Sequence, residues 1–226
     1  MPGRNRAREP TAGGFANDRA LGALGLDREK ITKCIVGAYR LLDRIDETLV
    51  ADGVEPLCQI VELANLSSMI GNIVGAELAR QSAGLYRRNA PHRYPDLLAA
   101  GPGAAPGGIE IKVALNRNQP KGHLAKEGFY ITCRYVLVDH VGVPIAEAVD
   151  RPRARRVAIW ELRTGRLDER HFNLSNTPGD SGKTAVVNAL GMEELKVVYV
   201  DLGLVPGTQR GRRYNWYRQL LGLSDV

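Results

Sequence analysis

The sequence of 226 residues has few cysteines and histidines and no long hydrophobic run. The three cysteines lie far apart without a CxxC spacing, so neither a disulfide framework nor a zinc site is implied. The four histidines form no HxxxH cluster, which also argues against zinc chemistry. No apolar run approaches ~18 residues, and the N-terminus lacks the hydrophobic stretch of a signal peptide. We therefore expect a cytoplasmic protein with no membrane span.

The length and charge of the chain are typical of one large domain with a polyanionic partner. A chain of 226 residues is long enough to bury a hydrophobic core. Its formal net charge of +6 favours a partner rich in phosphate, because neutralising phosphates releases counterions. Residues 1–20 are rich in Arg, Gly and Pro and are expected to form a flexible basic arm. Residues 21–226 are expected to form the single domain.

Residues 21–85 are predicted to be a helical region. Apolar residues recur at helical spacing over 27–49, and the aspartate at the start of this segment would cap the helix. Its apolar stripe is either core or a dimer interface. A second helical segment is predicted over 56–84, with a break near Ser67 and Ser68.

Residues 86–205 are expected to contain the central sheet. Strands rich in β-branched and aromatic residues are predicted at 129–139, 156–162 and 195–202. A helical pattern at 184–190 separates the later strands. In the C-terminal segment, 206–226, basic and aromatic residues alternate, which suits a nucleic-acid contact or equally the packing of Trp216 under the domain edge.

Three charged residues around a glycine-rich loop carry the strongest functional signal. Charged and apolar residues alternate in Ile109-Glu110-Ile111-Lys112, so in a strand Glu110 and Lys112 share one face. If Asp96 ends the preceding strand, the loop between them can bring it beside Glu110. Two carboxylates and an ammonium group would then meet at one point.

This trio suits the hydrolysis of phosphodiester bonds. Mg²⁺ prefers oxygen ligands, and one or two carboxylates plus a substrate phosphate are enough to hold it. Asp96 and Glu110 would be those ligands, with the backbone carbonyl of Ile111 as a third. Lys112 would stabilise the attacking hydroxide and the charge that grows on the phosphate oxygens.

Pro95-Asp96 followed by Glu110-Ile111-Lys112 resembles the PD-(D/E)xK motif of the restriction-endonuclease-like superfamily. The resemblance implies an α/β fold with a mixed central sheet flanked by helices, and a preceding helix that supplies a further acid to the metal site. Glu77 stands where that catalytic acid is expected, and Glu62 is a weaker candidate.

The function that the resemblance implies is a Mg²⁺-dependent type II restriction endonuclease that cuts double-stranded DNA and leaves 5′-phosphates. Cutting both strands of a palindrome further implies a homodimer. A repair or recombination nuclease of the same superfamily, and a non-catalytic DNA-binding protein, remain alternatives.

Two polar loops are predicted to face DNA, because their side chains can donate hydrogen bonds to phosphates or base edges. The candidates in the first loop are Arg117, Asn118, Lys121, His123 and Lys126, and those in the second are Asn173, Asn176, Ser181 and Lys183. The segment 177–184 also nearly matches a phosphate-binding loop, and 197–201 resembles its Mg²⁺-binding partner. An NTPase is therefore a further alternative, although the first glycine is missing and few residues follow.

Overall fold

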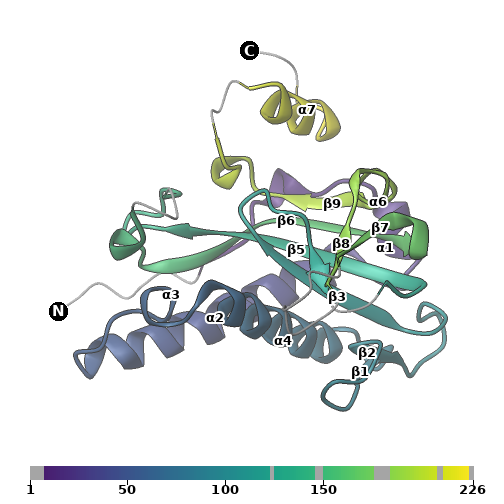
Figure 1. Ribbon diagram of the computed structural model, residues 1–226, viewed down its shortest axis with the longest axis horizontal. Coiled ribbons are helices and arrows are strands. Elements are labelled where there is room, and N and C mark those ends of the chain that lie inside the picture. The colour runs from purple at the N-terminus through teal and green to yellow at the C-terminus, as the bar shows by residue number, and fades with distance from the viewer. Residues whose placement is uncertain (1–7, 123–124, 146–149, 176–183, 208–210, 224–226) are drawn as a thin grey trace.

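The computed structural model describes residues 8–122, 125–145, 150–175, 184–207 and 211–223 (Figure 1). The main sheet has six strands in the order β1 (Tyr86–Arg88), β2 (Leu97–Ala99), β3 (Ile109–Leu115), β5 (Gly128–Val138), β6 (Arg156–Leu167) and β9 (Lys196–Val200). A smaller sheet has three strands in the order β4 (Lys121–Gly122), β8 (Thr184–Val187) and β7 (Phe172–Ser175). Strands β3 and β5 pair in parallel and the other neighbours pair antiparallel, so the predicted α/β class with a mixed central sheet is confirmed.

The helices α2 (Arg28–Ala51), α3 (Leu57–Ile60) and α4 (Leu63–Gln81) lie together on one face of the main sheet (Figure 1). The short helices α1 (Asp18–Gly22) and α6 (Ala189–Glu194) and the C-terminal α7 (Arg212–Leu220) lie elsewhere around the sheet. Single turns of 3-10 helix occur at Ala12–Gly14, Arg151–Arg153, Glu169–His171 and Leu202–Leu204. No helix in the described part of the chain has the length and apolar character needed to cross a membrane.

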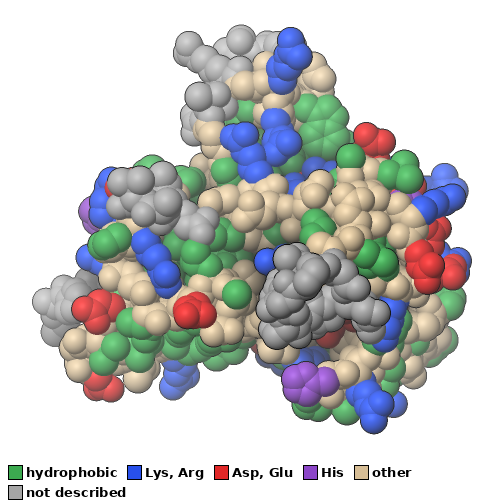
Figure 2. Space-filling model, viewed as in Figure 1, with side chains coloured by type: hydrophobic (Ala, Val, Ile, Leu, Met, Phe, Trp, Pro, Cys, Tyr) green, Lys and Arg blue, Asp and Glu red, His purple; other side chains and the backbone are tan. Residues whose placement is uncertain are grey.

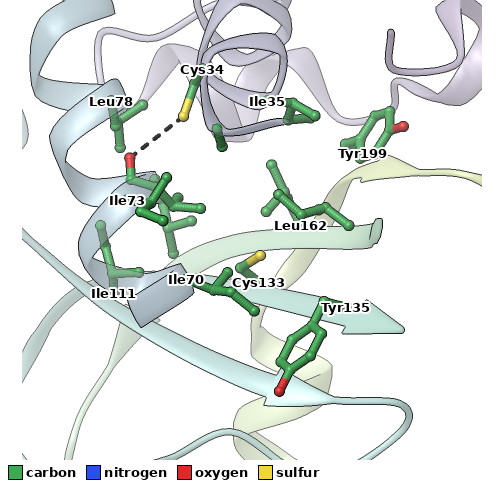
Figure 3. Close-up of a cluster of buried hydrophobic side chains, with 14 of the residues drawn as sticks. Cys34, Ile35, Ile70, Ile73, Leu78, Ile111, Cys133, Tyr135, Leu162 and Tyr199 are labelled. Carbon is green, nitrogen blue, oxygen red and sulfur yellow. Dashed lines mark hydrogen bonds between the residues drawn. The ribbon is translucent and has the colours of Figure 1, made fainter. Parts of the chain in front are cut away.

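Helix α2 begins where the sequence predicts, because the Asp27 carboxylate accepts a hydrogen bond from the Lys30 amide at 2.8 Å. Its apolar stripe packs on α4 and the sheet in the largest hydrophobic cluster (Figure 3). Within this cluster the Cys34 thiol lies 3.6 Å from the Val74 carbonyl oxygen. Most of the stripe is therefore core, although Leu41 is 42% exposed.

The helical segment after α2 breaks at Val61 and Glu62, between α3 and α4, and not at the two serines where the sequence suggested. The Ser67 and Ser68 hydroxyls donate to carbonyl oxygens four residues earlier, so both serines are accommodated inside a continuous helix. On the side of α4 that faces the sheet, Gly75 allows close contact with Ile111 of β3.

The prediction of a helix over 184–190 is wrong at its start, where the chain forms a strand of the small sheet. Residues Thr184–Val187 form the central strand β8, and the helix α6 begins only at Ala189, capped by the Asn188 side chain. Buried side chains of the small sheet pack against the main sheet in a separate hydrophobic cluster with Tyr130 and Leu195.

Residues 8–20, which composition assigned to a flexible arm, instead lie against the domain. The Arg8 guanidinium pairs with Asp43 of α2, and the Phe15 ring lies 5.2 Å from the Tyr199 ring of β9. At the other end of the chain, Tyr217 of α7 is buried against Trp160, whereas Trp216 is 46% exposed. The residue of α7 that packs under the domain edge is thus Tyr217.

Candidate functional site

The Asp96, Glu110 and Lys112 cluster lies at the junction of β2 and β3. Asp96 immediately precedes β2 and does not end the preceding strand, and the register places Leu97 opposite Ile109. Gly108 makes this close approach possible. Its φ is +89°, and a Cβ atom there would lie 2.0 Å from the Leu97 carbonyl oxygen.

Three contacts link these residues into one cluster. The Ile111 amide donates to Asp96 Oδ2 at 2.8 Å, and the Asp96 amide donates to Glu110 Oε2 at 3.2 Å. The Lys112 ammonium forms an ion pair with Glu110 Oε1. The predicted meeting of two carboxylates and a lysine is therefore present in the fold.

The electrostatics of the cluster are set by burial. Glu110 is only 9% exposed, and this burial raises the pKa of its carboxyl group. The Lys112 ammonium lowers that pKa, whereas the nearby Asp96 carboxylate raises it further, and the net shift is upward. Strand β4 covers the lysine, because a Cβ atom on Gly122 would lie 2.7 Å from Lys112 Nζ.

The oxygen atoms of the cluster fit a hard divalent cation. Asp96 and Glu110 supply carboxylate oxygens, and the Ile111 carbonyl points to the same side as its amide, toward Asp96, because both groups of a strand residue face one neighbour. Among the described residues, no group of three His, Cys, Asp or Glu side chains could hold a metal ion. Two carboxylates with water and a substrate phosphate match what Mg²⁺ requires.

The structure does not bring Glu77 into the cluster. The Glu77 carboxylate pairs with Arg80 and faces α2, where a Cβ atom on Gly37 would lie 2.0 Å from it. Gly75, two residues earlier on α4, faces Ile111, so the helix is rotated with Glu77 turned away from the sheet. Neither the catalytic nor the metal-binding role predicted for Glu77 is supported by its position.

Sequence reasoning missed two residues that hold the motif in place. The Asn89 amide group donates to the Pro95 carbonyl at 2.9 Å, and the Asn89 backbone amide donates to the Asp96 carbonyl at 2.9 Å. The Tyr94 hydroxyl donates to the Glu127 carbonyl at 2.8 Å and so joins the motif to the start of β5. Tyr94 stands directly before the Pro-Asp pair, which is the signal that could have identified it.

The residues predicted to face DNA occupy different positions. Lys121 and Asn173 are both exposed and lie in one row across the small sheet, on either side of Val186. The Lys126 ammonium lies 4.5 Å from the centre of the Tyr94 ring, beside the cluster.

Of the remaining predicted DNA contacts, Arg117 and Asn118 lie in the loop after β3, and the others lie outside the residues that the structure describes. The Arg117 side chain donates to the Pro206 carbonyl at 2.8 Å, and Asn118 is exposed in the loop after β3. His123, Asn176, Ser181 and Lys183 lie outside the described residues, as does most of the segment that resembles a phosphate-binding loop. The aspartate proposed as its Mg²⁺ partner, Asp201, instead accepts a hydrogen bond from the Gly203 amide and caps a 3-10 turn.

Comparison with protein families and with curated sequences gives no match. No protein-family model matches the chain, and no curated protein sequence matches it significantly. Function is therefore inferred from the chemistry of the Asp96, Glu110 and Lys112 cluster.

Proposed function

We propose that the protein is a Mg²⁺-dependent endonuclease that hydrolyses phosphodiester bonds in double-stranded DNA, in the manner of a type II restriction enzyme. The observation that supports this proposal is the cluster at the junction of β2 and β3, where the Ile111 and Asp96 amides and the ion pair of Lys112 link Asp96, Glu110 and Lys112, with the spacing of the PD-(D/E)xK motif. The pairing of β3 beside β2 in a mixed sheet is consistent with it.

Asp96, Glu110 and the Ile111 carbonyl are the groups that would hold Mg²⁺. When bound, the ion would polarise the scissile phosphate and lower the pKa of water. The Ile111 amide fixes the orientation of the Asp96 carboxylate, so little reorganisation is needed when a ligand binds. Because Glu110 and Asp96 are close and Glu110 is buried, a divalent cation would relieve the repulsion between them.

Lys112 supplies a positive charge that the fold positions in advance. Its ammonium is held by Glu110 on one side and covered by β4 on the other, so it is largely shielded from bulk water. In such an environment a fixed cation stabilises the charge that develops on phosphate oxygens more strongly than it would in water. The side chain would also orient the attacking water.

The proposed partner is double-stranded DNA, bound by a homodimer. The net charge of +6 and the exposed row of Lys121 and Asn173 favour contact with the phosphate backbone. One such site cuts one strand, so two copies related by a two-fold axis would cut both strands.

The test is cleavage of phage DNA with Mg²⁺ by the wild type and by matched variants. We expect discrete fragments from the wild type, and a loss of about 100-fold or more for Asp96→Asn and for Lys112→Met, with DNA binding retained. Glu77→Gln is the control, because its carboxylate faces α2, and it should keep most of the activity.

The other outcomes separate the alternatives. Smeared products would indicate a repair or recombination nuclease with the same chemistry. Absence of cleavage with any divalent cation would leave a DNA-binding protein and contradict the proposal. Equal losses in Glu77→Gln and Asp96→Asn would show that the assignment of the site is wrong.

A further inference from the structure

A cavity of about 800 Å³ lies between α7 and the main sheet, apart from the Asp96 cluster. Its volume is in the usual range for small-molecule sites, about 300–1,000 Å³. Positively charged side chains dominate its lining: Arg117, Arg134, Arg163, Lys196, Arg212 and Arg213. Glu193 is the acidic residue in the lining. Figure 2 shows Lys and Arg side chains gathered beneath the C-terminal helix.

The floor of this cavity carries an excess positive charge. Arg134 and Arg163 both donate to the Glu161 carboxylate, at 2.9 and 2.7 Å, so one negative charge faces two guanidinium groups. Glu161 is 1% exposed, and the Tyr217 hydroxyl also contacts it. The Nε atom of Arg163 is buried, and it has no hydrogen-bond partner among the described residues. A buried charge without full compensation is costly, so an anion in the cavity would be stabilised.

The walls add cations that form no ion pair with a carboxylate of the described residues. Arg212 and Arg213 begin α7, and within the described ranges neither has an ion-pair partner. The Lys196 ammonium donates to the Glu193 carbonyl at 3.0 Å, which is a neutral acceptor, and it forms no ion pair within the part of the chain that the structure describes. These three side chains line the cavity from two elements and offer it cations that can pair with a phosphate group.

The cavity also has an aromatic surface beside these cations. Trp216 is 46% exposed, and the Arg163 guanidinium lies 5.7 Å from the centre of its ring. Apolar side chains of Leu195, Val197 and Leu220 extend this surface. An exposed indole next to arginines is the combination that stacks nucleobases while holding their phosphates.

We propose that this cavity binds a nucleotide, with the base against Trp216 and the phosphate against Arg212, Arg213 and Lys196. The nucleotide is either a free mononucleotide or one unit of a nucleic-acid strand. The site is distinct from the carboxylate cluster but on the same face of the main sheet, because Lys112, Thr132 and Arg163 form one cross-strand row. At about 4.8 Å per strand, Lys112 and Arg163 are separated by about 10 Å along this row.

The experiment uses the full chain carrying Asp96→Ala, without Mg²⁺, so that binding is measured apart from cleavage. The probes are deoxyadenosine monophosphate, a single-stranded oligothymidylate and inorganic phosphate. Binding is followed by calorimetry and by tryptophan fluorescence, in which Trp216 is the reporter because Trp160 is fully buried. We expect either nucleotide probe to quench Trp216 and to bind at least 10-fold more tightly than phosphate.

Matched variants test the residues. Arg212→Ala with Arg213→Ala should weaken binding by about 10-fold or more, and Trp216→Ala should do so by about 5- to 100-fold. The control, Arg40→Ala with Arg44→Ala, removes the same charge from exposed positions of α2, on the opposite face of the sheet, and should change little.

The outcomes decide whether the cavity binds a nucleotide, and whether that nucleotide is free or part of a strand. Tight binding of the mononucleotide indicates a free nucleotide, and binding of the oligonucleotide alone indicates a strand. Equal affinity in the Arg212 and Arg40 double variants, or phosphate bound as tightly as both nucleotides, would overturn the proposal. Because the measurement needs no cleavage, the nuclease proposal can fail while this one stands, and the reverse also holds.

Discussion

Burial of Glu110 makes the stability of the metal-free protein depend on pH. Its carboxyl pKa is raised above the ordinary value of 4.5, so the folded protein binds this proton more tightly than the unfolded chain. The stabilisation is fully present below pH 4.5 and is lost as the pH rises through the folded pKa. We therefore expect Glu110→Gln to gain stability relative to wild type between pH 4.5 and pH 8.

Urea unfolding of both proteins at several pH values, without and with Mg²⁺, measures this difference. Mg²⁺ should reduce the gap at pH 8, because the cation offsets the repulsion that destabilises the ionised wild type. A gap that does not vary with pH would show that Glu110 is not the titrating group.

At the residue scale, the positions of Glu110 and Lys112 could be predicted because the alternation of residues along a strand determines them. Alternation in β3 places Glu110 and Lys112 on one face, and the structure has both on the face away from α4. Glu77 was not predictable in the same way, because α4 is apolar around much of its circumference and its rotation is fixed by Gly75 against Ile111. That packing joins two elements far apart in sequence, so the residues around Glu77 do not by themselves indicate which way its side chain faces.

At the scale of elements, two neighbouring glycines offer a direct test of how β2 and β3 meet. Gly107 and Gly108 both have positive φ, but only at position 108 would a Cβ atom collide with the Leu97 carbonyl. Gly107→Ala should cost about 1–2 kcal/mol for the left-handed backbone alone. Gly108→Ala should cost distinctly more and should also separate Asp96 from Glu110.

Thermal unfolding and cleavage activity of the two variants provide the comparison. Loss of activity in Gly108→Ala, with activity retained in Gly107→Ala at a temperature where both are folded, is the expected result. Similar behaviour of the two variants would mean that the close approach of the strands does not position the carboxylates.

Helix α2 and strand β5 were predicted close to their observed bounds, whereas β6 runs five residues past its predicted end and the short strands β4 and β8 were missed. Helix α2 has an apolar stripe at helical spacing, and strand β5 is a long run of β-branched and aromatic residues, so both could be recognised from sequence. Strand β4 has two residues, and β8 is short enough that its apolar residues fit either period, which led to a helix being predicted there. Its conformation is determined by pairing with β4 on one side and β7 on the other.

At the scale of the whole molecule, the positive charge predicts how DNA binding depends on salt. With a net charge of +6, most of the affinity of an Asp96→Ala variant for duplex DNA should come from phosphate contacts. Raising salt from 50 to 200 mM should weaken binding by about 10³-fold or more if six or more phosphates are contacted.

Fluorescence anisotropy across this salt range checks the prediction, and Lys121→Ala should reduce the slope by about one phosphate contact. An affinity that is independent of salt would exclude a surface that follows the DNA backbone.

The cover over Lys112 has a consequence for the order in which the surroundings of the cluster are assembled during synthesis. Gly122 of β4 is held over the lysine by pairing with Ala185 of β8, and the Val187 amide donates to the Pro120 carbonyl at 2.9 Å. The motif therefore leaves the ribosome well before the strand that completes its surroundings. A nascent chain therefore carries all three charged residues before β8 has been synthesised, and the enclosure of Lys112 forms only once that strand is present.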